Sequence, residues 1–356
     1  MKHKRIVSMI GMLVVLLCTL FMMTGCPTGQ EPQKQQEDVE IWLYYSFPEC
    51  EYLNTGYLYQ DGSYAVDFFG STKFGIESLI SKRVRKGEKI KLLDNGGGST
   101  LEVRGYGYGS GYYTAEYKKE FIFAKNGKGI IGWSKKKDGS TKDYDFGQEI
   151  TVTANEDVTL YPAYTKYGIG DSIDGKTVVY IRRDYVTKEN SYSVEGTDWR
   201  YIAVDVAAGK NSEGRNWWYN SAKNIITSDN IGTGKENTKA IIDPSINVAN
   251  DNTAGNNAFY YCSIISPNGY VPSKGEMQWV ANAIQYRKLE GFSVYGSETK
   301  KFWTSSQKDT VNAWYIEIKN QSYSSVGYLK DNGTKAGMSL PIIPIVYYDD
   351  DGKVVK

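Results

Sequence analysis

Cysteine and histidine, the side chains that most often carry nucleophilic or metal-bound chemistry, are scarce in this chain. It has 356 residues, four cysteines and a single histidine, His3. Because no histidine follows His3, the chain lacks the general base of Ser-His-Asp and Cys-His systems and a common ligand of zinc and copper. We therefore predict that the chain is not an enzyme, with no catalytic residues, no metal site and no cofactor.

The sequence around Cys26 indicates a cysteine whose thiol is covalently modified and takes no part in catalysis. Basic residues within 2–5 precede an uncharged apolar run over 6–23, and two small residues stand directly before Cys26. This order resembles the lipobox of bacterial lipoproteins, where the chain is cut before a cysteine that carries lipid. We expect a lipoprotein signal peptide over 1–25, a lipidated Cys26 and a polar tether over 26–40. A transmembrane anchor is the alternative, since about 18 apolar residues can just span a bilayer.

Either anchor places the rest of the chain outside the cytoplasm. We expect it in the cell envelope, lipid-anchored and surface-exposed on the outer membrane. Without residues 1–25, which hold three basic side chains, it has 39 Lys and Arg against 41 Asp and Glu, a net charge of −2. A nucleic-acid-binding protein would show a basic excess, so nucleic acid is excluded as a partner. The expected partners are the membrane, through the lipid, and a host or extracellular glycan or protein.

Two further cysteines, Cys50 and Cys262, lie far apart in the chain. They could form a disulfide. Two separate small buried side chains are the favoured interpretation, because the chain lacks the cysteine framework of a small secreted domain.

Aromatic residues provide the candidate binding surface. The chain has 30 tyrosines, and exposed aromatic side chains offer contact area with little rotamer entropy. Trp217, Trp218 and Tyr219 lie between Asn216 and Asn220, a polar setting that suits binding of a sugar or peptide. Core packing is the alternative, and it is the better interpretation for at least one of the two tryptophans.

Two polar motifs are not expected to bind ligands. The run 232–235 resembles a phosphate loop, but Asp229 replaces the required first glycine and Glu236 replaces the required Ser or Thr. We predict a turn there. The three adjacent aspartates 349–351 are expected to be solvated, since they lack the downstream glutamate of a calcium loop.

The elements that would position these residues begin with short β-branched and aromatic runs, which predict strands. The expected strands lie at 41–45, 89–93, 121–123, 150–153 and 158–161. Turn residues separate them, including a hairpin-type Asp138-Gly139. The Gly- and Tyr-rich stretch 105–113 is expected to be a loop.

Over about 88–165 the chain resembles the Listeria–Bacteroides repeat, the B-repeat of internalin-type surface proteins. The residues that carry the resemblance are Asn95-Gly96-Gly97, Gly132-Trp133, Asp138-Gly139 and the closing run 158–164. Tyr164 replaces the final tryptophan of the family pattern. The resemblance implies a small β-grasp-like module, and we expect a β-rich stalk over 41–165. Residues 41–87 match no family pattern.

After residue 168 the pattern changes. Strands are expected at 177–181 and 199–204. Ser273 and Glu276 form a capping box, in which each side chain satisfies a backbone amide of the other. Apolar residues at helical spacing follow it, so the sequence predicts a helix over about 274–288.

Residues 168–356 resemble the bacterial C-type-lectin-like domains, of the type found at the C terminus of the Legionella collagen-like adhesin. The residues that carry the resemblance are Gly170-Asp171, Trp199-Arg200-Tyr201-Ile202, Gly232 to Thr238, Gly269 to Met277, Phe302 to Ser306 and Ala313-Trp314. The closing strand 340–345 lacks the family's arginines. The calcium and sugar triplets of animal lectins do not occur, so the resemblance does not imply calcium-dependent sugar binding.

The sequence thus predicts an α+β fold, in which a β-grasp-like stalk precedes a C-type-lectin-like domain. The expected function is that of an adhesin-like surface lipoprotein that binds a glycan or protein through this domain. A structural envelope protein is the main alternative. A glycoside hydrolase that works with two carboxylates is a further one, although no spacing nominates a pair.

Overall fold

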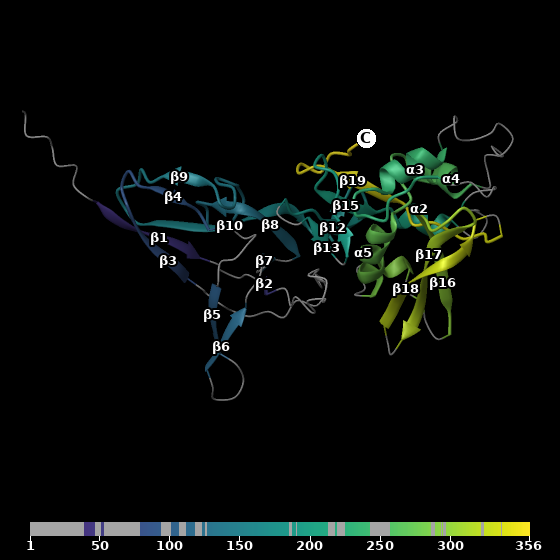
Figure 1. Cartoon of the computed structure of the whole chain (residues 1–356), viewed down its shortest axis with the longest axis horizontal. Coiled ribbons are helices and arrows are strands. Elements are labelled where there is room, and N and C mark those ends of the chain that lie inside the picture. Colours follow the sequence, from purple (N-terminus) through teal and green to yellow (C-terminus); the bar gives the residue numbers. More distant parts are fainter. Residues whose placement is uncertain are drawn as a thin grey trace, which may run out of the picture.

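The structure is a computed structural model with two parts arranged along its long axis (Figure 1). It describes residues 39–46, 51–52, 79–93, 101–106, 112–117, 123–124, 127–184, 187–189, 191–212, 218, 225–242, 257–285, 289–292, 294, 297–321, 324–335 and 337–356. Cys26 and Cys50 lie outside the described residues. Within these ranges no helix has the length and apolar character needed to cross a membrane.

The N-terminal part is built on a four-stranded mixed sheet. Its strands, in the order β3-β1-β10-β8, are β3 (Leu79–Arg85), β1 (Glu40–Ser46), β10 (Val158–Gly168) and β8 (Lys128–Ser134). β1 runs parallel to β10, and the other two pairings are antiparallel. Ile41, Leu43 and Tyr45 alternate with exposed or half-buried residues, so one face of β1 enters the core.

A second layer covers this face. β4 (Lys89–Lys91) pairs with β9 (Glu149–Thr151), and Ile90 of this pair belongs to the same core as Leu43 and Leu160. Trp133 lies at its centre, where its indole donates to the Leu93 carbonyl (2.9 Å). The expected strands at 41–45, 89–93, 150–153 and 158–161 correspond to β1, β4, β9 and β10, whereas β3 and β8 of the main sheet were not predicted.

Two smaller strand pairs lie within the same part of the chain. β2 (Glu51–Tyr52) pairs with β7 (Phe123–Ala124), and β5 (Leu101–Tyr106) pairs with β6 (Tyr112–Tyr117). The loop expected at 105–113 is thus wrong at both ends, because Gly105, Tyr106, Tyr112 and Tyr113 lie in paired strands. The residues between them lie outside the described part.

The C-terminal part begins with a second four-stranded sheet. Its strands, in spatial order, are β11 (Ser172–Ile173), β12 (Lys176–Ile181), β15 (Tyr201–Val204) and β19 (Ile345–Tyr348). All residues of β15 and β19 are buried. A short pair, β13 (Lys188–Glu189) with β14 (Tyr192–Ser193), adjoins it.

A three-stranded antiparallel sheet and the helices complete this part (Figure 1). The strands are β16 (Thr299–Gln307), β17 (Asn312–Gln321) and β18 (Ser324–Thr334). The helices are α2 (Val206–Asn211), α3 (Gly234–Ile242), α4 (Ala258–Ile265), α5 (Lys274–Gln285) and the 3-10 turn η1 (Glu290–Phe292). Met277, Trp279 and Ile284 of α5 share one core with residues of both sheets. The α+β class, mostly β, is confirmed at this level.

Helix α5 begins where the sequence predicts. The Ser273 amide donates to Glu276 Oε2 (2.7 Å), and the Glu276 amide donates to Ser273 Oγ (3.3 Å). This is the reciprocal pairing of a capping box. The helix extends to Gln285, and residues 286–288 lie outside the described part.

Strand β10 connects the two parts. It pairs with β1 and β8 and continues to Gly168, where the Ile169 amide donates to the Gly127 carbonyl (2.9 Å). β11 follows after three residues, so the β10 backbone leads directly into the second part.

Candidate functional site

Trp218 does not belong to the expected aromatic contact surface; core packing, the alternative favoured for at least one of the two tryptophans, holds for it. This side chain is fully buried, and its ring packs edge-on against Phe259 with centroids 5.1 Å apart. Its indole donates to the Thr304 carbonyl (2.6 Å), so its polar atom is satisfied inside the core. Trp217 and Tyr219, the other two members of the predicted surface, lie outside the described residues.

Cys262 is a free thiol buried in the same core. Burial raises the pKa of this thiol, so it stays protonated and unreactive at neutral pH.

A polar cavity of about 700 Å³ lies where the two parts meet. The N-terminal side of its lining includes Lys128 and Lys142, and the C-terminal side includes Arg200 and Asp350. Its volume falls within the range of about 300–1,000 Å³ that is typical of ligand sites. We take this junction cavity as the candidate site.

A tight turn builds one wall of the junction cavity. Gly139 has φ +63°, and a Cβ there would meet the Pro162 carbonyl oxygen and would lie 2.5 Å from the Tyr164 ring. The Gly139 carbonyl accepts the Tyr164 amide (3.0 Å), which fixes the turn to β10. Asp138 Oδ1 accepts the Ser140 amide (3.0 Å). This backbone hydrogen bond, helped by the Ser140 hydroxyl, lowers the pKa of Asp138, so its carboxyl is ionised at neutral pH.

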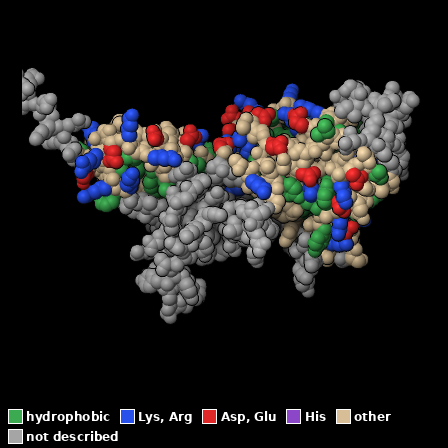
Figure 2. All heavy atoms as spheres, in the orientation of Figure 1, with side chains coloured by type: hydrophobic (Ala, Val, Ile, Leu, Met, Phe, Trp, Pro, Cys, Tyr) green, Lys and Arg blue, Asp and Glu red, His purple; other side chains and the backbone are tan. Residues whose placement is uncertain are grey.

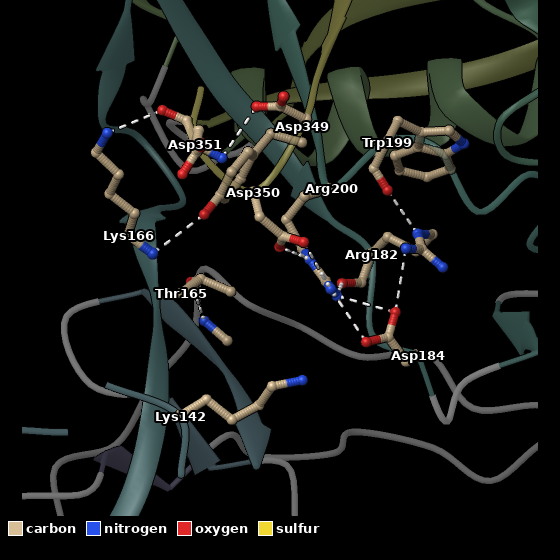
Figure 3. Close-up of polar contacts among 12 residues, drawn as sticks. Lys142, Thr165, Lys166, Arg182, Asp184, Trp199, Arg200, Asp349, Asp350 and Asp351 are labelled. Atoms are coloured by element: carbon tan, nitrogen blue, oxygen red, sulfur yellow. Dashed lines mark hydrogen bonds and ion pairs between the residues drawn. The ribbon is translucent and has the colours of Figure 1, made fainter. Parts of the chain in front are cut away.

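The opposite wall holds an arginine that is almost fully buried (Figure 3). Both terminal nitrogens of Arg200 donate to the Asp184 carboxylate (3.1 and 3.0 Å), and its Nε donates to Asp350. Burial alone would raise the pKa of Asp184, but the hydrogen bonds and charge of Arg200 lower it. Arg182 also pairs with Asp184 (3.1 Å), so two guanidinium groups meet two carboxylates in this cluster.

Asp350 and Asp351 are exposed, as expected for the solvated aspartates at 349–351, but they also make specific contacts. Asp350 is a partner of Arg200, and Asp351 presents its carbonyl to Lys166 Nζ (2.8 Å) (Figure 3). A signal for this was present in the sequence. Arg200 lies in an apolar strand run, and a buried arginine requires a carboxylate partner.

Tyrosine hydroxyls and rings close the junction. The Tyr201 hydroxyl accepts the amides of Lys166 (3.1 Å) and Tyr167 (3.4 Å), and its ring packs edge-on against Tyr167. Burial raises the pKa of Tyr201, so it remains a neutral phenol. The two parts are therefore joined by hydrogen bonds as well as by the chain.

The cavity offers cations, carboxylates and hydroxyls on its described lining. Lys142 pairs with Asp145 (2.7 Å), whereas Lys128 has no ion-pair partner among the described residues. In the described part of the chain, no three His, Cys, Asp or Glu side chains are placed to hold a metal ion. The arrangement suits hydrogen bonding to a polar ligand.

The phosphate-loop-like run 232–235 binds a carboxylate of the protein itself. The amides of Gly232 (2.8 Å) and Gly234 (3.4 Å) donate to Glu276 Oε1, which also accepts the Tyr347 hydroxyl. Burial raises the pKa of Glu276, and these hydrogen bonds oppose the rise. An internal carboxylate thus takes up these donors, and the run forms the turn and first residues of α3 instead of a nucleotide site.

Comparison with known proteins gives no relative: no family model, no curated protein and no solved structure matches this chain.

Proposed function

We propose that this chain is a lipid-anchored, surface-exposed envelope protein that binds an extracellular glycan in the junction cavity. In this proposal Cys26 carries the lipid on the outer membrane. The internalin-repeat-like module forms the stalk, and the C-type-lectin-like domain supplies the other wall of the site. The observation that carries the proposal is the set of charged and hydroxyl-bearing side chains that line the cavity.

The chemistry of that lining favours a glycan. Sugar hydroxyls both donate and accept hydrogen bonds, and the cavity presents Lys128 and Lys142 as donors and Asp138 as an ionised acceptor. Arg200 and its carboxylates hold the opposite wall in place, so binding of a ligand there costs little side-chain conformational entropy. An apolar ligand would leave these groups without partners.

Glycan-array screening of the mature chain with Cys26→Ser tests the proposal. We expect a specific hit that is weakened at least about tenfold in the double variant Lys128→Ala and Lys142→Ala, as expected when hydrogen bonds to charged groups are lost. Lys330→Ala, an exposed change on β18 away from the cavity, serves as the control. A hit that is equally strong in the double variant would contradict the assignment of the site.

Binding is also expected to survive EDTA, because the described residues hold no metal-ligand group at the cavity. Loss of the array signal in EDTA, with recovery in calcium, would contradict a metal-free site.

A structural envelope protein is the second candidate, and the continuity of β10 favours it. β10 runs from the N-terminal sheet to the start of the C-terminal part, and with the hydrogen bonds across the junction it makes a stiff spacer. The absence of any binding signal on glycan and matrix-protein arrays would favour this candidate. Cleavage of polysaccharides by the same protein would instead favour a carboxylate-dependent glycoside hydrolase.

A further inference from the structure

Exposed cations line one edge of the N-terminal part, along β3, β4 and the turn between them. The six side chains are Lys82, Arg83, Arg85, Lys86, Lys89 and Lys91, and all are exposed. Glu88 is the single acidic residue of the segment 79–93. Figure 2 shows Lys and Arg side chains gathered at this end of the molecule. We call these six residues the basic edge.

The basic edge keeps much of its positive charge. Glu40 pairs with both Arg83 (3.3 Å) and Arg85 (3.4 Å), so one carboxylate serves two guanidinium groups. Lys86 donates to the neutral side chain of Asn155 (2.6 Å). Within the described residues, Lys82 and Lys89 form no ion pair.

Acidic residues near the basic edge are already engaged or lie at its border. Asp157 accepts the Trp42 amide (2.8 Å), and Glu149 lies opposite Lys91 in β9. Neither faces Lys82 in the β1–β3 register, where the opposing residue is Leu43. The lysines therefore present their charge outward.

The chain enters the module beside the basic edge. The Lys86 amide donates to the Val39 carbonyl (3.0 Å), and Arg85 is paired with Glu40. Val39 lies thirteen positions after Cys26. At about 3.5 Å per residue this segment spans at most about 45 Å, and any less extended course brings the basic edge closer to the lipid.

We propose that the basic edge rests on the anionic surface of the membrane that holds the lipid anchor. The inference rests on the proposed lipidation of Cys26, which confines the protein to that surface. Lysine ammonium groups then lie within about 8–10 Å of lipid phosphates. This is about the Debye screening length at physiological salt, so their attraction is not fully screened. Each lysine raises the partition onto anionic lipid about fivefold.

Vesicle sedimentation of the mature chain with Cys26→Ser tests the contact without the anchor. This variant carries no lipid and keeps every described residue. We expect it to bind vesicles of phosphatidylcholine mixed with phosphatidylglycerol, to ignore vesicles of phosphatidylcholine alone, and to dissociate in high salt.

The triple variant Lys82→Gln, Lys86→Gln and Lys89→Gln should lose about 100-fold in binding to the mixed vesicles. The matched control, Lys308→Gln, Lys319→Gln and Lys330→Gln, removes the same charge from exposed positions of the C-terminal part and should lose little. Equal losses in the two triple variants, absence of binding to the mixed vesicles, or competition by millimolar inorganic phosphate at constant ionic strength would each overturn the proposal. Fatty-acid labelling of Cys26 is a separate measurement, so failure of the anchor and failure of the basic edge are distinguishable.

Discussion

Trp218 and Lys335 are a buried pair in the smaller core of the C-terminal part. Lys335 Nζ lies 4.7 Å from the centre of the Trp218 ring, and its side chain is almost fully enclosed. A cation against an indole face is attracted by the negative face of the ring. Burial of the ammonium group nevertheless carries a desolvation cost, which lowers the stability of the folded protein. Each residue can be tested by itself.

Trp218→Ala should destabilise the protein by about 3–5 kcal/mol, because it removes a fully buried indole and its hydrogen bond. Chemical denaturation of the mature chain measures the loss. Trp218→Phe retains much of the volume and should cost less. If Trp218→Ala unfolds at the same denaturant concentration as the parent, the indole does not pack as described.

Lys335 should give the protein a pH-dependent stability. Burial lowers the pKa of Lys335 from 10.5 to about 8. Between these values the unfolded chain holds a proton that the folded chain has released, so this group's contribution to folding becomes more favourable as the pH rises from about 8. Lys335→Met should therefore be most stabilising below pH 8.

The measurement is the difference in unfolding free energy between Lys335→Met and the parent from pH 7 to pH 10. Groups common to both proteins, including the tyrosines, cancel in this difference. It should shrink as the pH rises. A constant difference across this range would contradict the lowered pKa.

At the scale of elements, the start of a helix and the shape of a turn depend on a few local hydrogen bonds and backbone angles. Single substitutions can therefore destabilise either one. Ser273→Ala removes the acceptor of the Glu276 amide and should cost about 1 kcal/mol. Ser263→Ala, on an exposed position of α4, is the matched control and should cost less. Identical denaturation curves for Ser273→Ala and the parent would show that the α5 N terminus does not depend on this cap.

Gly139→Ala should cost about 1–3 kcal/mol, because its φ of +63° disfavours a side chain and the added Cβ meets backbone and ring atoms of β10. The same change at Gly175, which also has positive φ but has open space around it, isolates the part due to the backbone conformation. Equal costs at the two positions would show that the turn does not press against β10.

Local patterns predicted several strands, among them β1, β4, β9 and β10, and the start of α5, but they missed β3 and β8 and did not predict pairing between distant segments. The run 158–161 was expected as a strand, whereas its parallel pairing with β1 depends on residues more than 100 positions away, and its extension to Gly168 pairs with β8. Trp218 misled for the same reason. Its neighbouring asparagines are polar, but Phe259 and Thr304, which enclose it, lie elsewhere in the sequence.

At the scale of the whole molecule, the proposed anchor and the proposed site lie in different parts of the chain. Cys26 precedes the basic edge, whereas the junction cavity lies at the far end of β10, where the C-terminal part begins. The proposal therefore separates attachment from recognition, and either can be removed without the other.

Cys26→Ser in the full-length chain should abolish labelling by a fatty-acid probe and leave an unprocessed precursor, since the thiol that accepts the lipid is gone. Labelling in cells, followed by gel analysis, measures both. Normal processing of this variant would contradict the lipoprotein assignment.

The parallel pairing of β1 with β10 has a mechanical consequence. β1 starts at Glu40, beside the incoming tether, and β10 leaves toward the C-terminal part at Gly168. A pulling force between an anchored N terminus and a held C-terminal part therefore slides the two strands past each other. In that geometry the hydrogen bonds of Leu43, Tyr44 and Tyr45 with their β10 partners are loaded together, whereas peeling would break them one after another. The module is thus built to resist tension along its length.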